Sequence, residues 1–258
     1  MLVLNAHFTD DFFVILGFKF GADSITGNKQ TLTWHRILEA FKFGYAYRPF
    51  IGDPEFYPNV GKSQDVQINT TYAEDLRTKI WNNETHDSFY YERFYSTRKD
   101  SGTTHVSVIL STGDAVSVTS TVGYFYTTGI VYNNHMSSFS LPNTSKNYQP
   151  KASKAKFIQP GKRSVSTACP TIVVDSKGDV KMVLGGSGGL RIITGVAVVL
   201  LNKLWFGLRL EESIERGRLH HQLFPNTVYN EKNYIHDNIL ESVFIALKDL
   251  GHKMKGSR

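Results

Sequence analysis

The chain has 258 residues, of which 41% are hydrophobic and 20% are charged, the composition of a folded globular protein rather than a disordered one. Its net charge of +6 is uneven: residues 1–102 carry 11 basic and 13 acidic side chains, whereas residues 103–258 carry 18 and 10. No zinc spacing or nucleic-acid motif accompanies the basic half, so nucleic-acid binding is not favoured. A single cysteine, Cys169, excludes an intrachain disulfide.

The first 18 residues have no basic region before their apolar stretch, so they do not resemble a signal peptide. The longest apolar run, at 192–201, is far shorter than the roughly 20 residues that span a bilayer. Three glycosylation sequons, at Asn69, Asn83 and Asn143, favour passage through the secretory pathway. We therefore expect a secreted or cell-surface glycoprotein whose natural beginning lies upstream.

The first half of the chain has helical periodicity. An amphipathic helix is predicted over 31–48, capped by Thr31 or Thr33, with Ile37, Ala40, Phe41 and Tyr45 on its apolar face. A loop at 50–70 precedes a second helix over 71–83, which turns Leu76 and Ile80 inward. Residues 85–101 are aromatic and irregular.

From residue 103 onwards, apolar residues alternate with polar ones at a period of two, which is typical of strands. Alternating runs at 104–111 and 115–122 flank Gly113 and Asp114, which predicts a hairpin. A polar loop over 137–170 follows, and then a second hairpin over 171–186 with its turn at 175–179. A buried helix at 190–206 and an amphipathic helix at 236–250 complete the pattern, the latter with Ile239, Val243, Ala246 and Leu247 on one face.

Three local motifs each allow more than one interpretation. The stretch "VLGGSGGLRIIT" lacks the Lys-Ser/Thr ending of a phosphate loop, which leaves either an oxyanion-binding backbone or a tight structural turn. His220 and His221 are adjacent and point in different directions, so packing or hydrogen bonding is favoured over a metal pair. Cys169 has no base near it in the sequence and is expected to be structural.

Four segments in chain order, "DSGTTHVSV", "AVSVTSTV", "SVSTACPTIVV" and "GGSGGLRIITG", resemble the γ-glutamyltranspeptidase (glutathione hydrolase) family. The segments "LTWHRILEAFKFGYAYRPFIGDPEF", "KFIQPGK", "LWFG" and "RLHHQLFPN" extend the resemblance over nearly the whole chain. It implies an α+β fold, the four-layer αββα sandwich of N-terminal-nucleophile hydrolases, of which this chain is a part. Residues 1–102 would be the end of the large subunit, and 103–258 the small catalytic subunit without its last strands.

The resemblance also implies a site and a reaction. The precursor would cleave itself between Gly102 and Thr103, and Thr103 would then attack the γ-glutamyl amide of glutathione or a conjugate. Water or an acceptor amino acid or peptide would take the acyl group. Thr121 would hydrogen-bond the nucleophile, Ser166 and Thr167 would hold the substrate carboxylate, and Gly188 and Gly189 would form the oxyanion hole. The family implies an extracellular two-subunit enzyme, no cofactor and no metal.

The chain departs from the family pattern where the substrate α-ammonium would be held. Gly123 stands where an asparagine is usual, and "NNHMSSF" places His135, Ser137 and Ser138 at positions that usually carry acidic or amide groups. Loss of a charged partner for an ammonium costs on the order of 2–5 kcal/mol. The alternatives are therefore a divergent, catalytically impaired secreted copy that acts by binding, or a basic binding protein unrelated to glutathione.

Overall fold

The structure, a computed structural model of the whole chain, describes residues 2–4, 17–58, 69–91, 102–123, 129–142, 153–231 and 238–256. Its helices are α2 (Lys29–Tyr47), α4 (Thr70–Thr78), α5 (Arg191–Leu204), α6 (Leu210–Glu215) and α7 (Asn238–Asp249), with short 3-10 helices η1 (Ala22–Ile25), η2 (Arg48–Phe50), η3 (His135–Ser138) and η4 (Lys154–Lys156). Its strands are β1 (Leu2–Leu4), β2 (Thr103–Ile109), β3 (Ala115–Thr121), β4 (Thr171–Val174), β5 (Val180–Leu184), β6 (Leu219–His220), β7 (Val228–Asn230) and β8 (Met254–Gly256).

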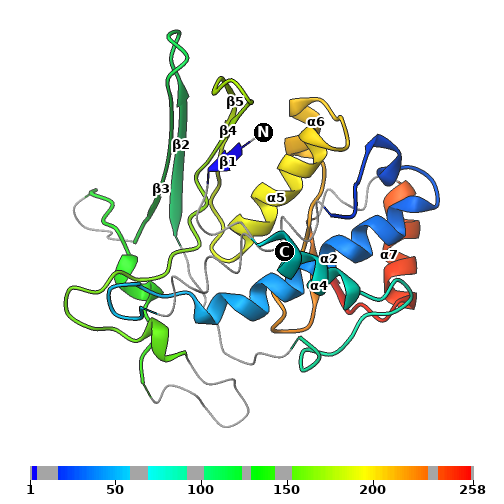
Figure 1. Cartoon of the computed structure of the whole chain (residues 1–258), viewed down its shortest axis with the longest axis horizontal. Coiled ribbons are helices and arrows are strands. Elements are labelled where there is room, and N and C mark those ends of the chain that lie inside the picture. The colour runs from blue at the N-terminus through cyan, green and yellow to red at the C-terminus, as the bar shows by residue number, and fades with distance from the viewer. Residues whose placement is uncertain are drawn as a thin grey trace.

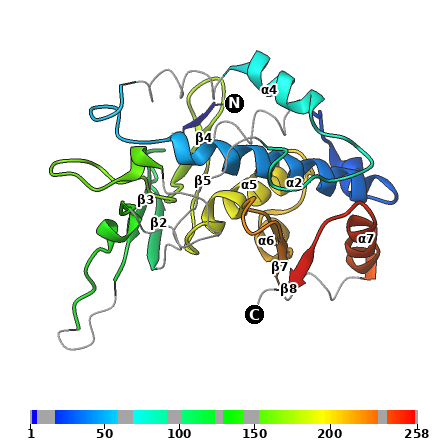
Figure 2. The ribbon, with the colours of Figure 1, turned by 90° about the horizontal axis from the view of Figure 1, so that it is seen from below.

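The strands form two three-stranded sheets and one separate hairpin. The order β1-β4-β5 is antiparallel throughout, whereas in β6-β7-β8 the second pair is parallel. The helices gather on one side of the molecule, and the hairpin β2–β3 stands on the other side (Figures 1 and 2). Helices and largely antiparallel sheets together make an α+β fold.

The core forms around α2, and its predicted apolar face is confirmed. Ile37, Ala40 and Phe41 are fully buried and Tyr45 nearly so. The same apolar cluster includes buried residues of α5 and α7, and α7 packs directly against α2. Because removal of apolar side chains from water stabilises a folded protein, this shared cluster stabilises the fold.

The predicted caps of α2 are wrong. The helix begins two residues earlier, at Lys29, and its N-cap is Asn28. Thr33 lies inside the helix, where its hydroxyl donates to the Ser24 carbonyl at 2.7 Å. A threonine that is packed against η1 is satisfied there and is no longer available for capping.

The other predicted elements are largely confirmed. Helix α4 ends at Thr78, earlier than predicted, although Leu76 and Ile80 are both buried as expected. Both hairpins form, and α5 and α7 match the predicted helices at 190–206 and 236–250. Of the predicted 50–70 loop, residues 51–58 form turns and irregular backbone, and 59–68 lie outside the described residues.

The hairpin β2–β3 has one covered and one open face. On the covered face, the Ser117 hydroxyl donates to the Leu184 carbonyl of β5 at 3.1 Å. On the open face, the cross-strand pairs Val106–Val118 and Val108–Val116 have exposed fractions of 40–55%. Exposed valines paired in this way indicate a sheet face that is suited to further packing.

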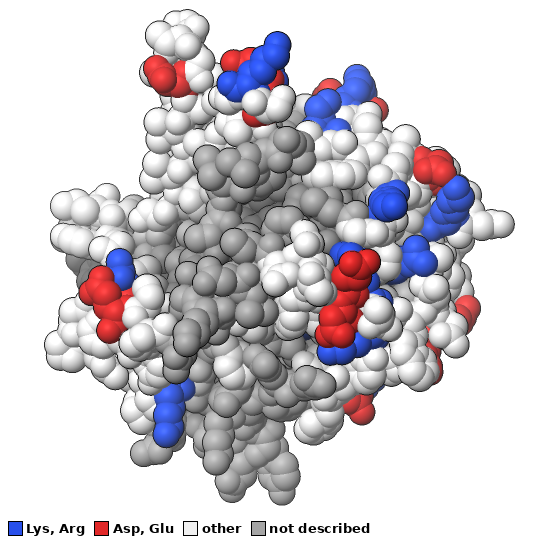
Figure 3. Space-filling view, viewed as in Figure 1, with Lys and Arg blue, Asp and Glu red and all other residues white. Residues whose placement is uncertain are grey.

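The segments on either side of the Gly102–Thr103 bond share one apolar core. Buried residues of α2 and α4 lie in the same cluster as those of β4, α5 and α7. On the face in Figure 3, basic and acidic side chains lie next to each other at several places. None of the helices in the described ranges is long and apolar enough to cross a membrane.

Candidate active site

Thr103 is the first residue of β2, and its position in the hairpin is set by strand register. β2 and β3 pair antiparallel, so Thr103 lies directly opposite Thr121. Thr121 is buried and Thr103 is half-buried. The two threonines that the family resemblance selects are therefore neighbours on one face of one hairpin, held by a rigid ladder of backbone hydrogen bonds.

Gly102 is constrained in two ways. Its φ is +91°, in the region that favours glycine, and a Cβ built on it would lie 2.0 Å from the carbonyl oxygen of Val122. Its own carbonyl accepts a hydrogen bond from the Val122 N–H at 3.0 Å. The carbonyl of the bond predicted to be cleaved is thus polarised by a fixed backbone donor.

The glycine-rich loop between β5 and α5 lies against the start of β2. The Ser187 hydroxyl donates to the Thr103 carbonyl at 2.8 Å. A Cβ on Gly185 would come within 2.3 Å of the His105 ring, so glycine permits this close approach. The His105 ring is itself fixed between the hydroxyls of Thr119 and Ser107, both at 2.8 Å.

Gly188 and Gly189 lie at the end of this loop, just before α5. Their φ values are +142° and +59°, which favour glycine at both positions. Within the described part of the chain, neither backbone N–H donates a hydrogen bond. Two unused donors beside a predicted nucleophile have the chemistry of an oxyanion hole, which stays a prediction.

The segment after β3 folds back onto Thr121. The backbone N–H of Asn134 donates to the Thr121 hydroxyl at 3.1 Å, and the Gly123 N–H donates to the Tyr132 carbonyl at 2.7 Å. In the described structure the Thr121 hydroxyl therefore contacts Asn134 rather than Thr103. These bonds hold the "NNHMSSF" segment at the predicted site.

His135 connects this segment to the third predicted one. Its Nε2 lies 2.8 Å from the Ser164 hydroxyl, two residues before Ser166. Ser166 accepts the Ala168 N–H at 3.0 Å, and Thr167 is buried with 2% exposure. Ser138 is half-buried in η3. Strand pairing thus joins Thr103 to Thr121, and hydrogen bonds link Thr121 to Asn134 and His135 to Ser164. The roles of the predicted substrate-binding residues stay predictions.

The sequence profile of γ-glutamyltranspeptidase matches residues 13–258. The chain belongs to the γ-glutamyltranspeptidase family. It is 39% identical over 246 residues to Scoloptoxin SSD14 of Scolopendra dehaani, covering 92% of this chain and 41% of that protein. To glutathione hydrolase proenzyme 1 of Schizosaccharomyces pombe it is 38% identical over 237 residues, covering 89% of this chain and 36% of the relative. The chain thus spans about two fifths of the length of these relatives.

A solved structure agrees with this assignment. A threonine-to-alanine mutant of Helicobacter pylori γ-glutamyltranspeptidase has a TM-score of 0.50 and 30% sequence identity, covering 60% of this chain and 84% of that chain. The family assignment and the α+β class predicted from sequence are therefore confirmed.

The three sequons of this γ-glutamyltranspeptidase homologue have different surroundings. Asn69 and Asn83 are exposed, and Asn143 lies outside the described residues. The Asn69 side chain accepts the Thr71 N–H at 2.8 Å and caps α4. In the second sequon, the Thr85 hydroxyl donates to Glu39 at 2.6 Å. This contact gives Thr85 a structural role that does not depend on a glycan at Asn83.

Sequence reasoning missed an ion pair across the predicted cleavage point. Asp53, from "GDPEF", accepts three hydrogen bonds from Arg163, from "PGKR", at 2.7–3.1 Å. Arg163 holds the pKa of the Asp53 carboxyl well below its usual range. The only sequence signal was that Asp53 lies in one segment of the family resemblance and that Arg163 directly follows another.

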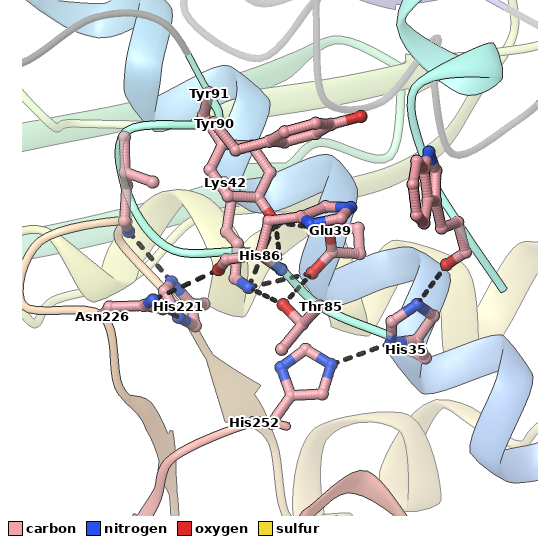
Figure 4. A network of polar contacts seen from close by, with 12 residues as sticks. His35, Glu39, Lys42, Thr85, His86, Tyr90, Tyr91, His221, Asn226 and His252 are labelled. Atoms are coloured by element: carbon pink, nitrogen blue, oxygen red, sulfur yellow. Dashed lines mark hydrogen bonds and ion pairs between the residues drawn. The ribbon is translucent and has the colours of Figure 1, made fainter. Parts of the chain in front are cut away.

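A buried polar network on α2 was also missed (Figure 4). Glu39 accepts from Lys42 at 2.9 Å and from Tyr91, and Lys42 also contacts Thr85. Glu39 and Lys42 have side chains with no exposure. Burial lowers the pKa of Lys42, although Glu39 opposes that shift. Helical periodicity does not predict this network, because it identifies only the apolar face of the helix.

His35 extends this network to the C-terminal segment. Its Nε2 lies 2.6 Å from the Trp81 carbonyl and its Nδ1 lies 2.8 Å from His252 Nε2. Because a carbonyl only accepts, His35 carries its proton on Nε2, and His252 donates from Nε2. Ligand atoms of His35, Glu39 and His252 lie within 4.8 Å of one another, as in a metal site. The Lys42 ammonium already neutralises Glu39 there, so a divalent cation would meet positive charge.

The remaining motifs fit their structural interpretations. His220 and His221 are buried, and their rings contact Thr194 at 2.7 Å and Asn226 at 3.1 Å. Burial lowers the pKa of both imidazoles, that of His220 to about 4. Cys169 is fully buried, and its sulfur lies 3.9 Å from the Thr171 hydroxyl. These three residues therefore stabilise the fold, as their sequence context predicted.

Proposed function

We propose that this chain forms the catalytic part of a γ-glutamyltransferase and glutathione hydrolase that cleaves itself between Gly102 and Thr103. One observation carries the proposal: the glycine-rich loop is hydrogen-bonded to the first residue of β2, and two of its N–H groups donate to no residue that the structure describes. Family membership supplies the reaction type, and the hairpin supplies a rigid position for the nucleophile.

Self-cleavage would begin with attack of the Thr103 hydroxyl on the Gly102 carbonyl carbon. The Val122 N–H, 3.0 Å from that carbonyl oxygen, would stabilise the oxyanion that forms. The C–N bond then breaks, the amine takes the proton from the hydroxyl, and an ester joins Gly102 to the threonine side chain. Water hydrolyses the ester and leaves a carboxylate on Gly102 and a free α-amine on Thr103.

The mature site would use that α-amine as the base for its own hydroxyl. The threonine oxygen attacks the γ-glutamyl carbonyl, the amide C–N bond breaks, and the protonated amine of the peptide leaves. The N–H groups of Gly188 and Gly189 would donate to the oxyanion, and Ser166 and Thr167 would hold the substrate carboxylate. Water or an acceptor amine then releases the acyl group.

The four-layer sandwich implied by the family would give a role to the exposed valine face of the hairpin β2–β3. In a four-layer αββα arrangement, a hairpin carrying the nucleophile packs one face against a second sheet. The pairs Val106–Val118 and Val108–Val116 form such a face. We assign it to the interior of the complete protein. Large and small subunits would stay together through Asp53–Arg163 and His35–His252, which bridge the cleavage point.

An extracellular location completes the proposal. The exposed sequons at Asn69 and Asn83 support it, together with the third at Asn143. Native protein treated with an N-glycosidase should gain mobility on a denaturing gel. Unchanged mobility would remove this support while leaving the proposed chemistry intact.

The function is tested by two measurements on the same full-length protein. N-terminal sequencing should find a smaller chain that begins at Thr103, and the T103A variant should stay intact. A γ-glutamyl anilide should release its coloured amine with wild-type protein and not with T103A. Cleaved protein that releases no amine would favour the impaired copy acting by binding, and an unbroken bond in folded protein would contradict the proposal.

A further inference from the structure

The stretch of chain from strand β3 to strand β4 carries no acidic side chain. Residues 115–174 are 60 positions without an aspartate or a glutamate. The same stretch has six basic side chains: Lys146, Lys151, Lys154, Lys156, Lys162 and Arg163. It includes Thr121, the segment "NNHMSSF" and the predicted carboxylate-binding pair. The part of the chain that would bind the acyl donor therefore offers hydroxyls and cations but no carboxylate.

Two carboxylates contact this stretch from outside it, and both pair with Arg163. Asp53 lies 2.8 Å and Glu55 2.9 Å from its guanidinium. The Asp53 side chain is 1% exposed, and its oxygens accept three hydrogen bonds from Arg163 and one from the Glu55 N–H. Among the residues that the structure describes, no other acid forms an ion pair with this stretch. The described contacts therefore bring no unpaired carboxylate to it.

The hydroxyls predicted to bind the substrate carboxylate retain a donor. Ser166 accepts the Ala168 N–H at 3.0 Å, and its own O–H donates to no residue in the described ranges. Ser166 is half-buried, and Thr167 beside it is buried. A hydroxyl donor in such a position suits a carboxylate oxygen, because a hydrogen bond to an ionised acceptor is stronger than one to a neutral group.

The side chains predicted to bind the α-ammonium offer no negative charge. They are those of His135 and Ser138, both half-buried. The segment is fixed at both sides, since its backbone donates to the Thr121 hydroxyl at 3.1 Å and the His135 ring lies 2.8 Å from the Ser164 hydroxyl. An ammonium that leaves water needs an ionised acceptor, which a hydroxyl or an imidazole does not supply. The site therefore disfavours an ammonium while it keeps a donor for a carboxylate.

We propose that the acyl donor favoured by this site is a glutaryl amide, which has the carboxylate of a γ-glutamyl group but no α-ammonium. The inference rests on the proposed function for the reaction and changes only the donor that the site favours. The Thr103 hydroxyl attacks the amide carbonyl, the C–N bond breaks, and the amine leaves with the hydroxyl proton. Water then hydrolyses the ester, which releases glutarate and restores the hydroxyl.

The first test measures binding without turnover. Full-length protein is titrated by calorimetry with glutarate and with L-glutamate, which differ only in the ammonium. Glutarate should bind about tenfold more tightly, because it has no ammonium to desolvate. L-Glutamate that binds as tightly as glutarate, or glutarate that does not bind, would overturn the inference.

The variant S138D shows where the two acids bind. Its added charge should weaken glutarate and strengthen L-glutamate, each by about tenfold. The matched control S176D adds the same charge in the exposed turn after β4 and should leave both affinities unchanged. The ratio of the two affinities is the measured quantity, because a folding defect would weaken both acids together. Equal ratios in S138D and S176D would mean that glutarate binds elsewhere, which would also overturn the inference.

Two anilides separate this inference from the proposed function. Faster release of the coloured amine from a glutaryl anilide than from a γ-glutamyl anilide would support the inference. The reverse order would overturn it and leave the proposed function intact. A Gly102–Thr103 bond that stays unbroken in folded protein would contradict the proposed function, whereas the calorimetric comparison would still decide which acid the site favours.

Discussion

At the scale of single residues, a comparison of Gly102 with Gly113 separates the cost of a positive φ from the cost of a steric clash. Gly113 has nearly the same conformation, with φ of +93° against +91°, but a Cβ there meets nothing within 4 Å. Alanine at either position incurs the strain of a positive φ, about 1 kcal/mol. Only at Gly102 does it also collide with the Val122 carbonyl.

We therefore expect G102A to abolish the cleavage that the proposed function requires, and G113A to allow it. The clash displaces the Gly102 carbonyl from the Val122 N–H, which removes the donor to the developing oxyanion. Denaturing gels of purified full-length protein would show one chain for G102A and two for G113A. Two chains in both variants would contradict this account of Gly102.

A second prediction at this scale concerns Ser138, which stands where the family resemblance places a partner of the substrate ammonium. Asn134 ties η3 to Thr121, so the side chain at 138 stays near the predicted site despite the sequence changes around it. S138D should restore a charged partner for the substrate ammonium and raise kcat/KM for a γ-glutamyl substrate. A regain of about 2 kcal/mol is roughly thirtyfold.

Two further substitutions refine that test. H135E should add to the gain, although it removes the contact to Ser164. G123N is less favourable, because its Cβ would lie 3.3 Å from the Asn134 Cβ, so that segment must shift slightly. S176D, in the exposed turn after β4, adds the same charge elsewhere and should change nothing. High native activity with glutathione would mean that another residue binds the ammonium.

At the scale of elements, helix α2 shows what the sequence could and could not predict. Its apolar stripe and approximate length follow from periodicity, and Ile37 and Phe41 are buried as expected. His35, Glu39 and Lys42 are also fully buried, at a spacing that places them on one side of the helix. Their partners, Thr85, Tyr91 and His252, are distant in sequence, so no local pattern could identify the network.

The same network predicts an asymmetric response to mutation. K42M should destabilise the protein by about 3–5 kcal/mol, because it leaves the Glu39 carboxylate buried without its cation. The double variant E39Q/K42M should be less destabilised than K42M alone, since the unpaired charge is gone. Urea unfolding monitored by circular dichroism would measure both.

The partly exposed pair Asp75–Lys79 at the C-terminal end of α4 provides the control for this comparison. Its atoms lie 3.0 Å apart, and 57% of the Asp75 side chain and 39% of the Lys79 side chain are exposed to solvent. K79M should therefore cost no more than about 1 kcal/mol. Equal losses in K42M and K79M would mean that Lys42 is better solvated than its contacts indicate.

At the scale of the whole molecule, the sequence identified the segments that match the family but not how these segments contact one another. The residues that matched the family were Thr103, Thr121, Ser166 and the glycines of the loop, and the fold joins them through contacts of Ser187, Asn134 and Ser164. The contact between Ser187 and Thr103 depends on how β2–β3 packs against β5. Packing between distant segments leaves no periodic signal in the sequence.

The buried histidines predict how the whole protein responds to acid. Burial lowers the pKa of His220 to about 4 and that of His252 to about 2, and those of His35 and His221 also lie below the usual 6.5. The unfolded chain therefore takes up protons first as the pH falls. Stability should be complete above pH about 6.5 and decrease below it, by about 1.4 kcal/mol per pH unit for each histidine in this window.

Urea midpoints measured at pH 7.5 and pH 5 would record this loss. The pKa of the Asp53 carboxyl is lowered by Arg163, so its own contribution disappears only at lower pH and does not obscure the histidines. H252N removes one buried imidazole whose pKa is lowered in the folded protein. The urea midpoint of this variant should therefore fall less steeply as the pH decreases, even if its midpoint at pH 7.5 is lower than that of the wild type. A midpoint that is independent of pH between 7.5 and 5 would mean that these imidazoles are protonated in the folded protein, with solvent reaching the cluster.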